Sequence, residues 1–156
     1  RFGRLAVPVI NDKPGYRFEI GKGIMLKGGR DVTIVATGLC VSAALEAAEL
    51  LKEDGVDAEV INIHTIKPID EDLLIGSAGK TGKVVTVEEH SVCGGLGSAV
   101  AEVLAEHMPV PMTRIGATDF AESGDYEQLL VKYGYGPESI AEKCEKVMKR
   151  KQVQKK

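Results

Sequence analysis

The sequence predicts an open α/β domain of three layers, with helices on both faces of a mostly parallel sheet of about five strands. The first observation is a rhythm in which short runs rich in β-branched residues alternate with longer runs of helical periodicity. The second is that glycine, proline or aspartate stands at most of the junctions, where these residues end strands or begin helices. Strand–helix–strand units of this kind form right-handed crossovers, so successive strands are expected to run parallel.

The first strand–helix unit has the clearest pattern. The run DVTIVAT at 31–37 is rich in β-branched residues and lies between Gly29 and Gly38, which is typical of a buried strand. Residues 41–53 then place valine, alanine and leucine side chains on one helical stripe, and Gly55 follows as a left-handed stop. This unit is therefore predicted to be a strand followed by a helix.

The unit recurs along the rest of the chain. Further strands are expected at 58–62, 83–88 and 112–115, and further helices from Asp70, at 96–106, at 126–133 and at 137–148. Asp70 suits a helix N-cap because two acidic residues follow it in the first turn, at the positive end of the helix dipole. Pro137 suits the first turn of the last helix.

The N-terminal stretch departs from this rhythm. Apolar and polar residues alternate along 16–26, and Gly21 and Gly23 interrupt this pattern. The pattern predicts an edge strand that can run antiparallel. Residues 3–15 include Pro8, Pro14 and Gly15 and are typical of an extended linker.

Composition limits the classes of protein to which the chain can belong. Its 156 residues suffice for one domain of roughly 100 to 150 residues. With 44% hydrophobic and 28% charged residues, the chain is too apolar to remain disordered. No apolar run approaches the ~20 residues of a membrane span, and the N-terminus has neither a signal core nor an initial methionine. We therefore expect a cytoplasmic fragment without a membrane partner.

The distribution of charge argues against a nucleic-acid surface. The formal net charge is −3, and because the tail at 149–156 contributes five positive and no negative side chains, the preceding residues carry −8. Phosphate binding needs lysines and arginines gathered on one face, and the seven aromatic residues are not interleaved with basic clusters. Nucleic acid is therefore not expected as a partner.

Cysteines and histidines give no sign of a metal site. Cys40, Cys93 and Cys144 are spaced too widely for a zinc pair or a vicinal redox motif, and three lone thiols suit a reducing compartment. All three are expected to be buried as small hydrophobic residues. The three histidines are dispersed in the sequence, so no metal ligand is predicted.

Function is expected at the loops outside the carboxyl ends of the strands. The most prominent loop leaves a strand at residue 88 and enters a helix through Gly94, Gly95, Gly97 and Ser98, whose free N–H groups could bind an anion. The glycine spacing matches neither the dinucleotide fingerprint nor a phosphate loop. A tight connection with close helix–sheet packing is the simpler interpretation.

Four polar residues on these loops are candidates for a cleft rim or an interface: His64, Lys67, Glu88 and His90. His90 could form an acid/base group with Glu88 and Glu89, although an exposed histidine is the simpler alternative. His64 and His90 leave the carboxyl ends of neighbouring strands, so we expect both imidazoles on the same rim of the sheet.

Five ordered motifs resemble the C-terminal domain of transketolase. They are DVTIVATG (31–38), ALEAAELLKEDG (44–55), VINIHTIKPID (60–70), VVTVEEHSVCGGLGSAVAEVL (84–104) and SGDYEQLLVKYG (123–134). The resemblance implies a C-terminal domain at 16–148, followed by the basic tail at 149–156. Residues 1–15 are similar to the end of the pyrimidine-binding domain and its linker, as in the C-terminal half of transketolases encoded as two polypeptides.

The resemblance implies an enzyme whose chemistry lies outside this chain. Transketolases use thiamine diphosphate and a divalent metal, Mg or Ca, to move a two-carbon ketol unit between sugar phosphates of the pentose phosphate pathway. The implied partners are the pyrimidine-binding domain of the same polypeptide, a diphosphate-binding subunit and a second copy in a homodimer. No catalytic residue and no cofactor is expected on this chain, which would serve assembly or regulation. Arg1 alone is similar to the family arginine that contacts the substrate phosphate.

Two alternatives remain open. The chain also resembles the C-terminal domain of pyruvate dehydrogenase beta-type chains, although the ending at 123–134 is more similar to transketolase. The alternative outside enzymes is a stand-alone assembly module. It would bind a nucleotide at the turn formed by Gly94, Gly95, Gly97 and Ser98, which we call the glycine turn.

Overall fold

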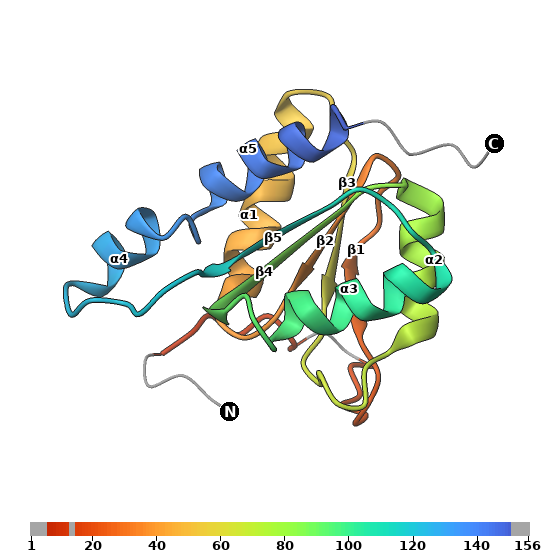
Figure 1. The fold of residues 1–156 in the computed structure, drawn as a ribbon, viewed down its shortest axis with the longest axis horizontal. Coiled ribbons are helices and arrows are strands. Elements are labelled where there is room, and N and C mark those ends of the chain that lie inside the picture. Colours follow the sequence, from red (N-terminus) through yellow and green to blue (C-terminus); the bar gives the residue numbers. More distant parts are fainter. Residues whose placement is uncertain (1–5, 13–14, 151–156) are drawn as a thin grey trace.

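Five strands and five helices alternate in the computed structural model, which describes residues 6–12 and 15–150 (Figure 1). The strands are β1 (Ile24–Lys27), β2 (Val32–Ala36), β3 (Ala58–Asn62), β4 (Val84–Ser91) and β5 (Met112–Ala117). The helices are α1 (Cys40–Glu53), α2 (Glu71–Thr81), α3 (Leu96–His107), α4 (Tyr126–Lys132) and α5 (Pro137–Met148). The order of the elements confirms the predicted alternation.

The strands form one mixed sheet in the order β1-β3-β2-β4-β5. The pairs of β2 with β3, β2 with β4, and β4 with β5 are parallel, whereas β1 pairs with β3 antiparallel. The pairing of β1 is irregular between Met25 and Lys27. A mostly parallel sheet with one antiparallel edge strand was predicted and is confirmed.

Two helices cover each face of the sheet. The helices α1 and α5 pack together over one face, and α2 and α3 pack together over the other (Figure 1). On β2, Ile34 joins the core under α1 and α5, and Val35 joins the core under α2 and α3. Because β2 is covered on both sides, its sequence is a continuous β-branched run rather than an alternating one.

The capping residue Asp70 does more than begin α2. Its Oδ1 atom accepts the N–H of Leu73 at 3.3 Å, which confirms the predicted N-cap. Its Oδ2 atom accepts the N–H of Gly23 at 2.9 Å. The carboxylate therefore also holds the segment that leads into β1 against the start of α2.

Two predicted strands differ clearly from the structure in their bounds. The edge strand predicted within 16–26 is only Ile24–Lys27, because the chain turns at Gly21 with a φ of +85°. The strand predicted at 83–88 continues to Ser91, since Ser91 pairs with Ala117 of β5. Glu89 and His90, which were expected in a loop, thus lie on β4.

The helix α4 lies beyond the sheet. It contains no buried residue, and Figure 1 shows it at the end of the molecule farthest from α2. The segment before it exposes 98% of Phe120, and the helix itself exposes Val131. We call the segment at 120–132 the α4 arm. It exposes apolar side chains that are not part of the domain's core.

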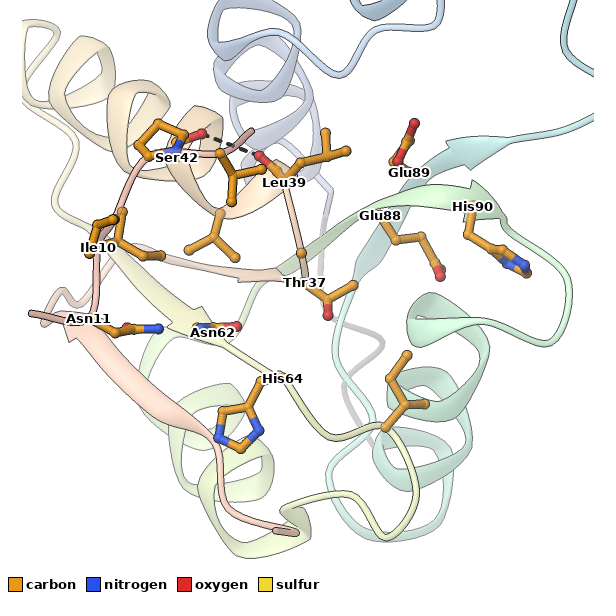
Figure 2. A pocket seen from close by; sticks show the side chains of 16 residues that line it. Ile10, Asn11, Thr37, Leu39, Ser42, Asn62, His64, Glu88, Glu89 and His90 are labelled. Carbon is orange, nitrogen blue, oxygen red and sulfur yellow. Dashed lines mark hydrogen bonds between the residues drawn. The ribbon is translucent and has the colours of Figure 1, made fainter. Parts of the chain in front are cut away.

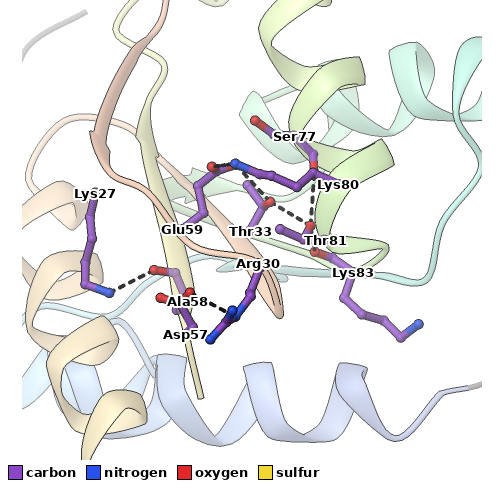
Figure 3. Close-up of polar contacts among 10 residues, drawn as sticks. All are labelled: Lys27, Arg30, Thr33, Asp57, Ala58, Glu59, Ser77, Lys80, Thr81 and Lys83. Carbon is purple, nitrogen blue, oxygen red and sulfur yellow. Dashed lines mark hydrogen bonds and ion pairs between the residues drawn. The ribbon is translucent and has the colours of Figure 1, made fainter. Parts of the chain in front are cut away.

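An ion pair with one buried partner joins elements at the amino end of the sheet. Glu59 on β3 has no exposed surface, and its carboxylate pairs with Lys80 of α2 (Figure 3). Thr33 of β2 donates to the same carboxylate at 3.3 Å and lies 2.8 Å from the hydroxyl of Thr81. Two strands and a helix are thereby joined through one carboxylate.

Replacing Lys80 with methionine should destabilise the fold by about 2 to 3 kcal/mol, because the fully buried Glu59 carboxylate would lose the cation that neutralises it. The control is Lys52→Met, which removes an exposed pair with Glu49 and should change stability by less than about 1 kcal/mol. Urea unfolding of both variants measures the difference. Equal losses would show that the buried pair has no special role.

Candidate functional site

The carboxyl ends of β2, β3 and β4 meet at one edge of the sheet, which we call the rim. An open pocket of about 800 Å³ lies there, lined by residues from the segments 7–11, 37–42, 62–66 and 88–90 (Figure 2). The loop after β2 leads directly into α1, and the segment 7–11 crosses the pocket from the N-terminal side. We call this hollow the rim pocket.

Both predicted histidines line the rim pocket and so share one rim, as expected. The premise that they follow neighbouring strands is wrong, because β2 lies between β3 and β4 and His90 is still part of β4. The Nδ1 atom of His64 lies 2.8 Å from the hydroxyl of Thr65, and its ring packs against Phe18 at a centroid distance of 4.5 Å. Burial lowers the pKa of His64, so the neutral imidazole is favoured. His90 is exposed, and its Nδ1 atom lies 3.2 Å from the carbonyl of Ser91.

Glu88, on the preceding strand β4, supplies acceptors to the N-terminus of α3, whose N-cap residue is Gly95. Its side chain is only 1% exposed, and its two oxygens accept the N–H groups of Leu96 and Gly97, each at 2.7 Å. The carboxylate is therefore turned towards the helix and forms no hydrogen bond with His90 within the described residues. The hypothetical acid/base group is not assembled.

The Glu88 carboxylate explains the glycine at position 95 of the glycine turn. A Cβ atom at Gly95 would lie 2.1 Å from Oε2 of Glu88, so no larger residue fits. The N–H groups of Leu96 and Gly97, which an anion-binding turn would offer, already donate to the chain's own carboxylate. This geometry favours close helix–sheet packing over anion binding.

Side chains hold the remainder of the turn. Ser98 accepts the N–H of Gly94 at 3.0 Å and donates to the carbonyl of Val92 at 2.9 Å. Arg114 of β5 donates to the same carbonyl at 2.9 Å. Ser98 therefore has a structural role that its position in the sequence did not reveal.

The expectation for the cysteines is only partly correct. Cys40 and Cys144 are buried, and burial raises the pKa of each thiol to about 12. Cys93 is exposed, which corrects the prediction that all three are buried. The physical reason is that Cys93 lies in the bend between β4 and α3, outside the faces of these elements that pack on the core.

Lys67 is separated from the other three polar candidates, His64, Glu88 and His90. It is exposed and lines a second hollow of about 500 Å³, between the loop at 66–69 and α3. Gly94, Gly95 and Ser98 line the same hollow. Lys67 therefore faces the glycine turn, whereas His64 faces the rim pocket.

The remaining predictions concern Arg1, the basic tail, metal ligands and membrane spans. Arg1 and most of the basic tail lie outside the described residues. Within 6–12 and 15–150, no group of three or more His, Cys, Asp or Glu side chains could hold a metal ion. No described helix is long and apolar enough to cross a membrane.

Asn62 is the site residue that sequence reasoning missed. It ends β3, lines the rim pocket and is only 5% exposed. A signal was present, since Asn62 is a polar residue between two isoleucines in the run VINI. A buried amide in such a run needs a partner, and its position at a carboxyl end indicates where that partner would lie.

Comparison with known proteins gives consistent similarities. The family model described as "Transketolase, C-terminal domain" matches residues 21–140. The 6-deoxy-6-sulfo-D-fructose transketolase subunit SqwH of Clostridium sp. (strain MSTE9) is 48% identical over 141 residues, which are 90% of this chain and 44% of that protein. One of the subunits of the apulose-4-phosphate transketolase of Phocaeicola vulgatus is 40% identical over 141 residues, which are 90% of this chain and 45% of that protein.

A solved structure is similar over nearly the whole chain. It is described as "Split gene transketolase, inactive beta4 tetramer", and it matches with a TM-score of 0.89 and 47% identity over 94% of this chain and 48% of that chain. The chain therefore spans less than half the length of these relatives.

Replacing Glu88 with glutamine should destabilise the fold by about 1 to 3 kcal/mol, because the amide nitrogen cannot accept one of the two helix N–H groups. Glu89→Gln is the matched control, since Glu89 is exposed and should lose less than about 0.5 kcal/mol. Urea unfolding compares the two. If both variants lost the same stability, the capping role of Glu88 would be contradicted.

The native chain should react with a thiol reagent at Cys93 alone, because burial keeps Cys40 and Cys144 protonated and covered. Denaturant should then release the other two thiols. Counting modified thiols by mass spectrometry in mildly alkaline buffer tests this expectation, with Cys93→Ser as the control that should show no native reaction. Modification of Cys40 at the rate of Cys93 would disprove it.

Proposed function

The chain belongs to the family of transketolase C-terminal domains, and on that basis we propose that it is part of a thiamine-diphosphate-dependent transketolase encoded as two polypeptides. The observation that carries the proposal is the similarity to the split gene transketolase across 94% of the chain. The described elements form a whole sheet with both faces covered, as expected of one complete domain. The reaction is the transfer of a two-carbon ketol unit between sugar phosphates.

The cofactor is proposed to bind outside this chain. A diphosphate with a divalent metal needs cationic donors and a cluster of oxygen ligands. The described lining of the rim pocket contains Glu88 and Glu89 but no lysine or arginine, and no metal-ligand cluster exists among the described residues. The residues here do not fit the group, so no step of the reaction is assigned to them.

The role of this domain is accordingly assembly rather than chemistry. Exposed apolar side chains support this role, namely Val7, Val9, Phe18 and Ile20 on the N-terminal segment and Phe120 and Val131 on the arm with α4. Surface of this kind suits contact with other protein domains. The occupants that we propose are the pyrimidine-binding domain of the same polypeptide, a diphosphate-binding subunit and a second copy of the polypeptide.

The names of the relatives bear on the substrate and on the assembly. One relative is named for 6-deoxy-6-sulfo-D-fructose and another for apulose 4-phosphate, and the solved relative is described as a beta4 tetramer. For this chain we propose sugar phosphates of the pentose phosphate pathway, a dimeric enzyme and a cytoplasmic location. Arg1 remains the proposed contact to the substrate phosphate.

A ketol-transfer assay tests the proposal. The complete C-terminal polypeptide mixed with its diphosphate-binding partner should transfer a ketol unit from xylulose 5-phosphate, whereas each component alone should not, because the cofactor site needs groups from several domains. A parallel assay with 6-deoxy-6-sulfofructose separates the two substrate classes. Preference for the sulfosugar would replace the proposed substrate and leave the reaction type intact.

Calorimetry on the 156-residue chain tests the proposal that the cofactor binds outside this chain. Thiamine diphosphate with magnesium should show no saturable binding to this chain, in keeping with its acidic rim pocket. Binding at micromolar levels would place cofactor chemistry on this domain and contradict the assembly role.

A further inference from the structure

Buried polar atoms without partners gather at the rim pocket. Among the described residues, six buried side-chain atoms have no hydrogen-bond partner, and three of the six belong to residues that line this pocket. The three are Oδ1 of Asn11, Oδ1 of Asn62 and Nε2 of His64. Such atoms are rare in folded proteins, so their concentration here indicates that the pocket receives a group from another molecule.

Asn62 is the one of these three residues that the sheet itself holds. Its backbone pairs with Ala36 of β2 on one side and with Ile24 of β1 on the other, and the residue is only 5% exposed. Figure 2 shows its amide oxygen directed towards the middle of the pocket, on the side of Thr37. The sheet therefore fixes an unpartnered acceptor against the chain that leaves β2.

The start of α1 lies beside this amide. Ala36 pairs with Asn62, and the residues that follow Ala36 begin the helix. Val60, two positions before Asn62, belongs to the core under α1 and α5, so the alternation of a strand places the Asn62 side chain on the same face as α1. The helix has no side-chain cap, and the N–H groups of 38–40 donate to no acceptor within the described residues. Free N–H groups at a helix start point outwards, so the pocket offers donors next to one fixed acceptor.

A full charge of either sign does not fit this place. The positive end of the α1 dipole opposes a cation. An anion is opposed by two carboxylates that act on Cys40, the first residue of α1: burial is the main cause that raises the pKa of this thiol to about 12, and the negative charges of Glu89 and Glu88 raise it further. The described lining has no lysine or arginine to pair with an anion. A neutral group that both accepts and donates hydrogen bonds is therefore the best complement.

We propose that the rim pocket accepts the carboxamide of a glutamine or asparagine side chain presented by the surface of another protein. The carboxamide oxygen accepts the free N–H groups at the start of α1, and its NH₂ group donates to Oδ1 of Asn62. Apolar side chains flank the pocket, since Val7 and Val9 belong to its lining and are 54% and 80% exposed. Exposed aliphatic surface around a small polar group suits a protein partner better than a free metabolite.

The inference goes beyond the proposed function, because it names the chemistry of a contact and depends on neither the reaction nor the cofactor. Its test therefore uses binding to the 156-residue chain, without an activity measurement. Inactivity in ketol transfer would not count against the contact, and lack of carboxamide binding would not count against the family role.

The first experiment titrates the ¹⁵N-labelled chain with N-acetyl-glutamine methylamide and follows the amide signals by nuclear magnetic resonance. We expect saturable shifts at the backbone amides of 38–42 and at the side-chain amide of Asn62, at millimolar concentrations because a few hydrogen bonds supply the affinity. N-acetyl-glutamate methylamide has the same shape but replaces the donor with a negative charge, so it should bind at least about threefold more weakly. Equal binding of the two probes, no saturable shift with the glutamine probe, or shifts with inorganic phosphate alone would overturn the proposal.

Two variants locate the contact. Asn62→Leu removes the acceptor and keeps the approximate size of the side chain, so it should weaken binding of the glutamine probe at least about threefold. It should also raise the urea midpoint of the free chain, because a buried acceptor without a partner lowers stability. The control is Thr113→Val, which removes another unpartnered buried oxygen, on β5, and should leave binding unchanged.

Unchanged binding by Asn62→Leu would refute the contact. A lower urea midpoint for this variant would show that a group of the chain already holds the amide, which also contradicts the proposal. The series of probes on the unmodified chain decides the question independently of how well either variant folds.

Discussion

The carboxylate of Glu88 is the interaction on which the rim depends. It stands on β4, it is buried, and it receives the first free N–H groups of α3. Burying a charge without a counter-ion is costly, and here the positive end of a helix and two short hydrogen bonds compensate it. The same contact requires glycine at position 95, so the close approach of α3 and this glycine of the turn depend on one side chain.

The same carboxylate also decides the chemistry that the rim can perform. It uses the N–H groups that would otherwise attract phosphate. The two ends of the sheet thus differ in character. At the amino end the buried Glu59 is paired with Lys80, whereas at the carboxyl end unpartnered acceptors border an open pocket. An end of this kind suits recognition of another molecule.

The fold could be predicted from the sequence because its signals are local. The β-branched run at 31–37 and the cap at Asp70 each depend on a few adjacent residues. The arrangement of the site could not be predicted, because its contacts are distant or ambiguous. Leu96 is capped by a residue eight positions earlier, on a strand, and the glycines that permit this contact look the same as glycines that bind an anion. The strand β4 was predicted too short because Glu89 and His90 are polar, although pairing with β5 carries the strand to Ser91.

The short edge strand β1 limits how the sheet can be extended by another chain. A sheet edge is a template for unwanted pairing with other strands. The strand is only four residues long, its ladder is irregular between Met25 and Lys27, and Lys27 donates to the carbonyl of Ala58 at 3.1 Å. A short, distorted and positively charged border offers little for a second sheet to continue. This edge of the sheet is thereby protected from edge-to-edge pairing.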